Sequence, residues 1–240
     1  MVYFVLMNAD FILNELRSVG TTEKAAILQR FFKTGKGQYG EGDVFLGVVV
    51  PHTRSIARAN SRTPIEEIAR LLHSPYHEAR LCALLILTER FKKAPIKARD
   101  DLFRFYLNHT DRINNWDLVD LSAPKIVGDY LIDKDRAILY RLVESAGLWE
   151  QRIAIISTLT FIRKNDFFDA FELAKRLFTH KHDLMHKAVG WMLREVGKRD
   201  RKALTDFLEE FATKMPRTTL RYAIEHYPEP ERQYFLKKKS

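Results

Sequence analysis

Hydrophobic side chains recur at helical spacing along the chain, and no stretch alternates strictly for long, as a half-buried strand would. Two apolar stripes are clear: Met185, Val189, Met192 and Val196 in one segment, and Leu204, Phe207, Leu208 and Phe211 in the next. The tetrapeptide Thr63-Pro64-Ile65-Glu66 predicts a capping box with proline at the first helical position. We therefore predict about twelve helices of ordinary length and an all-α chain.

The predicted helices form pairs, and one member of each pair carries a similar signature. A basic residue recurs at Arg80, Arg152, Lys187 and Arg221, and residues 115–120 lie near the midpoint of the first two. The spacing is close to 35 residues, which is typical of an α-solenoid of the HEAT or TPR kind. Such a fold has a concave face lined by one helix from each repeat, and these residues predict that the face is basic. No linker rich in Pro, Gly or Ser divides the chain, so we predict a single domain over residues 1–240.

One stretch, residues 34–43, is rich in glycine. It follows a helix predicted over residues 24–33. It is not a Walker loop, because no Gly-Lys-Ser/Thr ends it, and it is not a dinucleotide-binding fingerprint, because no parallel βαβ unit surrounds it. It is either a long connection that needs positive φ angles or a loop whose backbone packs close to a ligand.

Trp116 and Asp120 break the core pattern of their helix. Successive helical residues turn by about 100°, so the side chains at i and i+4 share one face. Leu118 and Leu121 point to the opposite side and can serve the core. A tryptophan and a carboxylate together on a non-core face indicate a functional site. The alternative is that Trp116 packs on a neighbouring helix and Asp120 is solvated or caps a helix.

Trp191 lies about 120° from the apolar stripe of its own helix. Lys187 and Arg194 are its neighbours on that side. A large aromatic ring beside basic residues suits stacking on a base, a sugar or a cation within a negatively charged polymer. The alternative is that Trp191 is partly buried against the next repeat.

Arg152 lies on the apolar side of its helix, in register with Ile155 and Ile156. A guanidinium in that position needs a partner or must extend outward at the helix start. It is either paired within the molecule, for example with a carboxylate of the adjacent repeat, or it is a clamp for phosphate, which suits its planar donors.

The composition limits the classes of function. The chain has 40 Lys+Arg against 31 Asp+Glu, a formal charge of +9, which favours a polyanion partner, with nucleic acid ahead of a membrane surface. Its one cysteine, Cys82, excludes an intramolecular disulfide framework and a Cys-rich metal site, and we expect it to be inert packing. The histidines at 180, 182 and 186 lack the spacing of a familiar metal site. We expect no metal and no cofactor.

We also expect a soluble, cytoplasmic protein, associated with the nucleoid if the source is bacterial. No apolar run approaches the ~20 residues that span a bilayer. The opening segment, residues 2–7, is too short and lacks the basic start of a secretory signal. A monomer is expected, because no self-complementary apolar seam is evident.

Several motifs in one order resemble the AlkD-type DNA alkylation repair proteins, a family of DNA glycosylases built from HEAT-like repeats. The resemblance runs from about Thr22 to Tyr227. Its motifs are residues 31–43, Phe45-Leu46-Gly47-Val48 with Pro51, Asn115-Trp116-Asp117-Leu118-Val119-Asp120, Trp149-Glu150-Gln151-Arg152-Ile153-Ala154, and residues 187–195.

The resemblance implies removal of alkylated purines, such as 3-methyladenine and 7-methylguanine, by hydrolysis of the N-glycosidic bond in duplex DNA. It places the catalytic carboxylate at Asp120, the two tryptophans that flank the lesion at Trp116 and Trp191, and a motif arginine at Arg152. It places Gln38 and Tyr39 in a loop near the lesion. Lys187 and Arg194 are then expected to contact DNA beside Trp191.

The chemistry agrees with these residue types. A purine alkylated on a ring nitrogen is already cationic, so it leaves without a general acid. One carboxylate can stabilise the developing oxocarbenium ion and orient the attacking water. Two other hypotheses remain open at this point: a non-catalytic relative that binds unusual DNA structures, and a helical-repeat scaffold that binds a protein.

Overall fold

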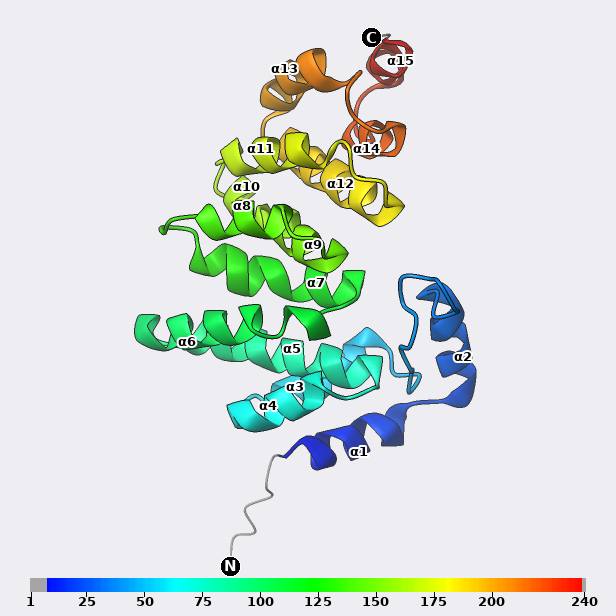
Figure 1. Cartoon of the computed structure of the whole chain (residues 1–240), viewed down its shortest axis with the longest axis vertical. Coiled ribbons are helices and arrows are strands. Elements are labelled where there is room, and N and C mark those ends of the chain that lie inside the picture. Colours follow the sequence, from blue (N-terminus) through cyan, green and yellow to red (C-terminus); the bar gives the residue numbers. More distant parts are fainter. Residues whose placement is uncertain (1–7, 239–240) are drawn as a thin grey trace, which may run out of the picture. The chain divides into compact units, whose positions relative to one another are not determined.

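The computed structural model describes residues 8–238, and these form fifteen α-helices with no β-strand among them (Figure 1). The all-α prediction is confirmed. The expected number of about twelve helices was too low, because short helices such as the four-residue α10 (Leu159–Ile162) have too few residues to show a periodic pattern. The apolar segment 2–7, which bears on the signal-peptide prediction, lies outside the described residues.

The chain divides into two compact units, one ending at Ser122 and the other beginning at Ala123. The prediction of one domain over residues 1–240 stays a prediction. The first unit contains α1 (Ala9–Val19), α2 (Thr22–Phe31), α3 (Val50–Ala59), α4 (Ile65–Leu72), α5 (His77–Lys93), α6 (Ile96–Leu107), a short 3-10 turn (Thr110–Arg112) and nearly all of α7 (Trp116–Ala123).

The second unit begins with a π-helical turn, Pro124–Gly128, and continues through eight α-helices. They are α8 (Ala137–Val143), α9 (Leu148–Ser157), α10 (Leu159–Ile162), α11 (Phe168–Leu177), α12 (Asp183–Arg199), α13 (Arg201–Phe211), α14 (Arg217–Ala223) and α15 (Glu229–Lys237).

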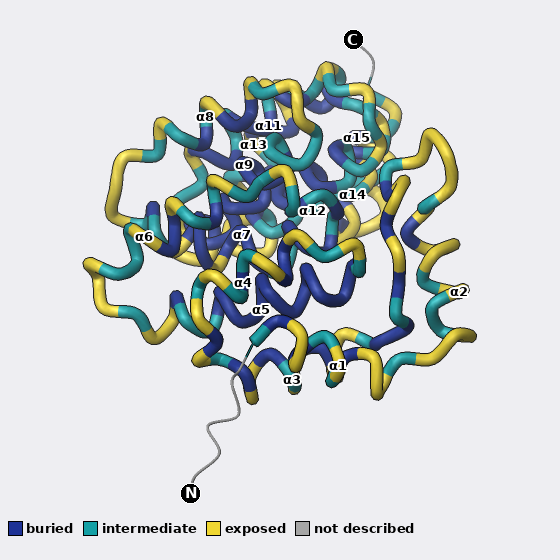
Figure 2. The backbone as a smooth tube through the Cα atoms, turned by 60° about the horizontal axis from the view of Figure 1, so that its bottom comes forward, coloured by how far each residue is buried: buried dark blue, intermediate teal, exposed yellow. Residues whose placement is uncertain are grey.

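Helix α5 is the centre of the first unit. It is buried along most of its length, and α1, α3 and α4 pack against it (Figure 2). A helix that is apolar on nearly all sides has to be enclosed by others. Cys82 lies in this helix with no exposed surface, and burial, together with the charge of Glu15, raises the pKa of its thiol to about 12. The prediction that Cys82 is inert packing is confirmed.

The capping box predicted at residues 63–66 is wrong. Helix α4 begins at Ile65, and no side chain caps its first turn. The Thr63 hydroxyl is buried and donates a hydrogen bond to the carbonyl oxygen of Asn60, 2.7 Å away, so it belongs to the preceding turn. Glu67 instead accepts a hydrogen bond from the backbone N–H of Ala9, at 2.7 Å, and so links α4 to the start of α1.

Helix α12 is the centre of the second unit, and both predicted stripes lie where the sequence placed them. The four residues of the α12 stripe are each no more than 1% exposed. In α13, Leu204 and Leu208 are fully buried and Phe207 nearly so, whereas Phe211, the last residue of the predicted stripe, is half-buried. Helix α14 packs closely on α12 at Gly190, where a Cβ atom would lie 2.5 Å from the Cβ of Tyr222. Only glycine permits that approach.

Consecutive helices pack in pairs within each unit: α4 on α5 in the first, and α8 on α9 and α11 on α12 in the second. The recurring basic residues lie on α5, α9, α12 and α14. The helical-repeat fold predicted from the 35-residue spacing is confirmed. The basic concave face stays a prediction.

Candidate functional site

Trp116 is the first residue of α7, and its neighbours fix the start of that helix. The Asn115 side-chain oxygen accepts a hydrogen bond from the Trp116 backbone N–H at 2.9 Å. The Asp117 carboxylate likewise accepts one from the Leu118 backbone N–H at 2.9 Å. The indole is half-buried and stacks on Phe32, with ring centroids 5.3 Å apart and planes 13° apart. Phe31, at the end of α2, touches it edge-on. Trp116 is thus neither a core residue nor fully exposed to solvent. It packs on the end of α2, which agrees with the alternative that this tryptophan packs on a neighbouring helix.

Asp120 lies one turn after Trp116 on α7, and it too is half-buried. Asp120 lies close enough to the buried hydroxyl of Tyr106 to influence its ionisation. Burial is the main cause that raises the pKa of Tyr106, and the negative charge of Asp120 adds to it. That hydroxyl lies 2.9 Å from the hydroxyl of Ser122, which lowers the pKa in part. Asp120 is only partly surrounded by water, and a carboxylate in such a position acts more strongly on a nearby cation than it does in bulk water.

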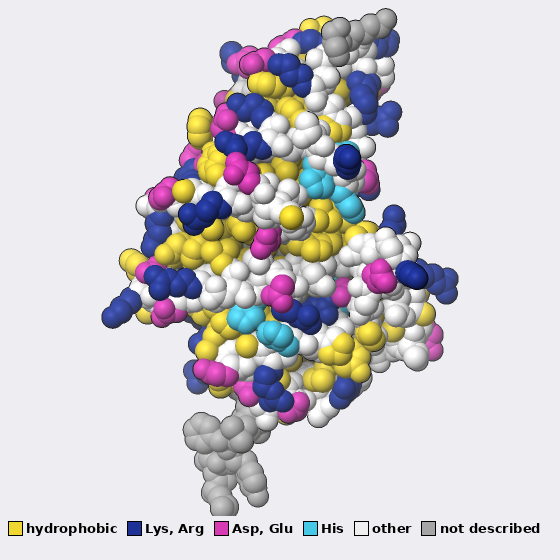
Figure 3. Space-filling view, in the orientation of Figure 1, with side chains coloured by type: hydrophobic (Ala, Val, Ile, Leu, Met, Phe, Trp, Pro, Cys, Tyr) yellow, Lys and Arg dark blue, Asp and Glu magenta, His cyan; other side chains and the backbone are white. Residues whose placement is uncertain are grey.

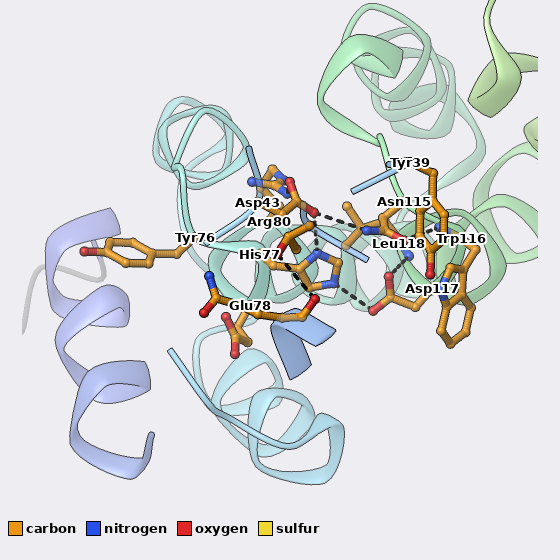
Figure 4. A network of polar contacts seen from close by, with 12 residues as sticks. Tyr39, Asp43, Tyr76, His77, Glu78, Arg80, Asn115, Trp116, Asp117 and Leu118 are labelled. Carbon is orange, nitrogen blue, oxygen red and sulfur yellow. Dashed lines mark hydrogen bonds and ion pairs between the residues drawn. The ribbon is translucent and has the colours of Figure 1, made fainter. Parts of the chain in front are cut away.

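A buried polar network lies beside the start of α7 and was not predicted (Figure 4). His77, the first residue of α5, bridges two carboxylates: its Nδ1 lies 3.1 Å from Asp43 and its Nε2 lies 2.8 Å from Asp117. Arg80 donates to the other oxygen of Asp43 at 2.5 Å. The Asn115 amide donates to Asp43 at 3.2 Å. Each of these five residues is at most 5% exposed, so the network joins three distant segments inside the first unit.

The charges within this network balance. Burial disfavours a charged imidazole, but the charge of Asp117 and the hydrogen bonds to both carboxylates outweigh it and raise the pKa of His77 to about 9. Burial likewise disfavours the ionised form of Asp43, but the His77 hydrogen bond and the Arg80 charge outweigh it and lower the pKa of Asp43. At neutral pH two cations thus face two carboxylates, which is the condition for keeping such charges buried.

The glycine-rich loop reaches this network through its last residue, Asp43. Gly37 and Gly42 adopt φ angles of 75° and 86°, so the prediction of a connection that needs positive φ is confirmed. Gln38 is exposed and accepts a hydrogen bond from the Gly35 N–H at 3.0 Å, which tightens the turn. The Tyr39 hydroxyl donates to the carbonyl oxygen of Phe31 at 3.4 Å. A ligand role for Gln38 and Tyr39 stays a prediction.

The segment after the loop is fixed by Glu78, a residue that the sequence analysis did not single out. Its carboxylate is buried at the start of α5 and accepts three backbone N–H bonds: Leu46 at 2.9 Å, Gly47 at 2.8 Å and Val48 at 3.1 Å. An irregular segment has no ladder partners of its own, so these bonds satisfy donors that would otherwise be buried and unpaired. Glu78 thereby ties the loop region to the central helix.

In the second unit, α12 carries Trp191 and the two basic residues predicted beside it. The Trp191 indole is half-buried and donates a hydrogen bond to Glu195 at 3.0 Å. Lys187 pairs with Asp183 at 2.6 Å, and Arg194 pairs with Glu225 of the loop after α14. Each predicted cation therefore already has an acidic neighbour, which DNA would have to replace.

Arg152 lies in α9 and is 5% exposed. Its guanidinium donates a hydrogen bond to the carbonyl oxygen of Leu184 in α12, 2.6 Å away. The alternative of a partner within the molecule is thus confirmed, and one such partner is the backbone carbonyl of Leu184. The phosphate clamp stays a prediction.

Arg80 is a correction to the predicted basic face. It was predicted to contribute to the basic concave face, but it is 2% exposed and paired with Asp43 inside the first unit. The recurrence of a basic residue at this helical position therefore has a structural cause here. On the face shown in Figure 3, Lys and Arg side chains lie among Asp and Glu side chains in each unit and form no unbroken basic band.

The histidines of the α11–α12 connection bond to their own backbone. His182 accepts a hydrogen bond from the Leu184 N–H at 3.1 Å, and the His186 ring contacts the carbonyl oxygen of His180. Within residues 8–238, no cluster of three or more His, Cys, Asp or Glu side chains has the geometry to hold a metal ion. In the same part of the chain, no helix has the length and apolar character needed to cross a membrane.

Comparison with known proteins decides the family. The sequence model of one family, described as DNA alkylation repair enzyme, matches residues 12–227. The chain belongs to the DNA alkylation repair enzyme family. Among solved structures, it is similar to a predicted DNA alkylation repair enzyme from Enterococcus faecalis, with a TM-score of 0.68 and 15% identity over 88% of this chain and 97% of that one. At that identity the likeness concerns the fold. No curated protein matches the sequence significantly.

The family match to DNA alkylation repair enzymes spans both groups of predicted site residues. Trp116, Asp120 and the loop residues Gln38 and Tyr39 belong to the first unit. The second unit holds the rest of the predicted set: Arg152, Lys187, Trp191 and Arg194. In the first unit the structure links α7 to the loop through Asp43 and Asn115. One signal in the sequence pointed to this network, namely the charged or polar residues 77, 78 and 80, which come directly before the apolar run 81–87 of α5.

Proposed function

We propose that this DNA alkylation repair family member is a DNA glycosylase. Its substrates are cationic alkylated purines in duplex DNA, such as 3-methyladenine and 7-methylguanine, and it hydrolyses their N-glycosidic bonds for base excision repair. The observation that carries the proposal is the half-buried pair of Trp116 and Asp120, one turn apart on α7 in a chain of this family.

The reaction needs little from the protein beyond charge and positioning. The bond between C1′ and the purine nitrogen breaks, its electron pair neutralises the cationic base, and the sugar becomes oxocarbenium-like. Water then adds to C1′ and loses a proton to Asp120 or to solvent. In this proposal the Asp120 carboxylate stabilises the positive sugar and orients the water, and its partial burial strengthens its electrostatic effect.

The tryptophans serve the cationic base. An aromatic face attracts a cation within about 6 Å of the ring centroid and also stacks on a base. Trp116 has one side against Phe32, which holds the indole firmly. In the proposal, Trp191 also serves the cationic base, with its ring oriented by the bond to Glu195.

The remaining predicted contacts would bind the DNA backbone. We propose that Arg152, Lys187 and Arg194 supply phosphate contacts and that the loop residues Gln38 and Tyr39 lie beside the damaged base pair. Lys187 and Arg194 are paired with acids in the free protein, and phosphate would replace those acids on binding. Duplex DNA with a single 7-methylguanine tests the proposed activity: we expect an abasic site at that position, which alkali converts into a strand break.

Binding to undamaged duplex DNA is expected to weaken steeply with salt. The chain has a formal charge of +9, and each phosphate that it neutralises releases counterions. With about five phosphate contacts, raising the salt from 50 to 200 mM should weaken binding by about 10²–10³-fold. Fluorescence anisotropy of a labelled duplex measures this. An affinity unchanged over that range would rule out a binding surface built on phosphate contacts.

Trp116→Ala and Trp191→Ala are each expected to slow excision about 5–150-fold, which corresponds to about 1–3 kcal/mol of lost stacking or cation–π attraction. The matched control is Trp149→Ala, which removes the third tryptophan, also half-buried. Single-turnover excision and thermal melting are measured on all three. If Trp191→Ala melts far below the wild type and Trp149→Ala does not, Trp191 is a core residue and not a ligand contact.

A further inference from the structure

Three connections join the buried network to Trp116. Its two chain neighbours, Asn115 and Asp117, are both hydrogen-bonded inside the network, the first to Asp43 and the second to His77. A third connection is aromatic. The Phe32 ring lies 4.8 Å from the His77 ring and 5.3 Å from the Trp116 ring, so it is layered between them. Trp116 is thus linked to His77 through the hydrogen bonds of its two chain neighbours, and the indole is linked to the His77 ring through the Phe32 ring.

We propose that His77 is a positioning residue for Trp116: by bridging Asp43 and Asp117 it locks the glycine-rich loop, the head of α5 and the first turn of α7 into one arrangement that sets the place of the indole. The effect of this arrangement on catalysis rests on the proposed glycosylase function, but the positioning itself does not.

The bridge depends on both ring nitrogens being donors. An imidazole that is neutral has one N–H and one lone pair, so one of its two contacts with a carboxylate oxygen would become repulsive. The titratable groups that face the ring are Asp43 from the loop, Asp117 from α7 and Arg80 from its own helix. The two carboxylates outweigh both burial and the Arg80 charge, and they keep the ring protonated at neutral pH.

The sign of the pH dependence follows from this. The pKa of His77 is about 9 in the folded protein, above its ordinary value of 6.5. Its contribution is therefore complete below pH 6.5 and is lost as the pH rises through about 9. Loss of the proton should loosen the link between Asp43 and Asp117 and release the first turn of α7. The position of Trp116 should change over that same pH range.

A protein with Trp149→Phe and Trp191→Phe keeps Trp116 as its single tryptophan, and this protein tests the positioning without DNA. Emission and acrylamide quenching are recorded with excitation at 295 nm between pH 6 and 10, and circular dichroism follows the helices. We expect a shift in both fluorescence signals with a midpoint near pH 9 while the helical signal persists. Adding His77→Gln should give the shifted signals already at pH 7 and remove the transition.

The control is His73→Gln, which alters an exposed histidine outside the network: its ring bonds to the Ala69 carbonyl oxygen of α4 and contacts the His109 ring edge-on. It should keep the transition near pH 9. If His77→Gln does not fold, Asp43→Asn and the pH titration of the single-tryptophan protein still decide the matter. A Trp116 signal that is unchanged through pH 10, or identical in the folded His77→Gln protein, would overturn the proposal.

Activity gives the second readout. At saturating methylated DNA, His77→Gln should lower the single-turnover excision rate at least tenfold at pH 7, while the DNA dissociation constant changes less than threefold. The ratio of wild-type to variant rates should fall towards one above pH 9, and this ratio cancels any titration of the substrate. Equal rates at pH 7 would contradict the link to catalysis. If the wild type itself releases no base, the glycosylase proposal fails, whereas the fluorescence result still decides the positioning.

Discussion

Asp120→Asn is expected to lower the rate of 7-methylguanine excision by about 10²–10³-fold while leaving DNA binding intact or tighter. The substitution is nearly isosteric, so the packing of α7 should survive. It removes the negative charge that faces the developing oxocarbenium ion in the proposed reaction. Binding should not weaken, because a carboxylate near phosphates repels them. Single-turnover release of the base from a duplex with one lesion measures the rate, and anisotropy measures the binding.

The choice of control for this variant follows from the structure. Asp117, three residues earlier, would seem the natural comparison, but it is buried and hydrogen-bonded to His77, so its replacement would disturb the network. Asp111 is better, because it is an exposed acid in the short turn before α7. Asp111→Asn should excise at the wild-type rate. A wild-type rate for Asp120→Asn would remove the catalytic assignment and most of the proposed mechanism.

Glu78→Ala is expected to have the largest effect on stability, about 3 kcal/mol of unfolding free energy. Its carboxylate accepts hydrogen bonds from the backbone N–H groups of residues 46, 47 and 48. Without the Glu78 carboxylate, three backbone N–H donors in a largely buried segment lose their acceptor. The segment 46–48 then also loses its hydrogen bonds to α5. Urea unfolding followed by circular dichroism measures the change in midpoint and slope.

Two variants calibrate that measurement. Glu78→Gln keeps one acceptor oxygen, so it should cost less than the alanine variant. Glu66→Ala removes an exposed glutamate of α4 and should change the unfolding free energy by less than about 0.5 kcal/mol. If Glu78→Ala and Glu66→Ala unfold at the same urea concentration, Glu78 does not anchor the 46–48 segment.

The elements that were predicted correctly depend on local periodicity. The stripes of α12 and α13 could be read from the sequence, because a helix repeats every 3.6 residues and one buried face repeats with it. The positive φ angles in the glycine-rich loop were likewise a local property. The capping-box prediction was wrong because the Thr63 hydroxyl can bond either to the preceding turn or to the first turn of the next helix. In the structure it bonds to the carbonyl oxygen of Asn60 in the preceding turn.

The buried network could not be predicted, because its bonds join residues far apart in the sequence. His77 is 34 residues from Asp43 and 40 from Asp117, and Asn115 is 72 from Asp43. No periodic pattern encodes such pairs. For the same reason Arg80 was assigned to the surface: its position in the repeat suggested a shared role, but its partner Asp43 comes from a loop outside the repeat pattern.

The glycosylase proposal is tested most directly by measuring free methylpurines released from methylated duplex DNA. The wild-type protein, Asp120→Asn and a protein-free sample are incubated with the same duplex, and the released bases are identified and counted by mass spectrometry together with the abasic sites. The account predicts that the wild type releases 7-methylguanine and 3-methyladenine far above the protein-free rate, with one abasic site per base, and that Asp120→Asn releases little. A wild-type protein that binds the duplex but releases bases only at the protein-free rate would contradict it.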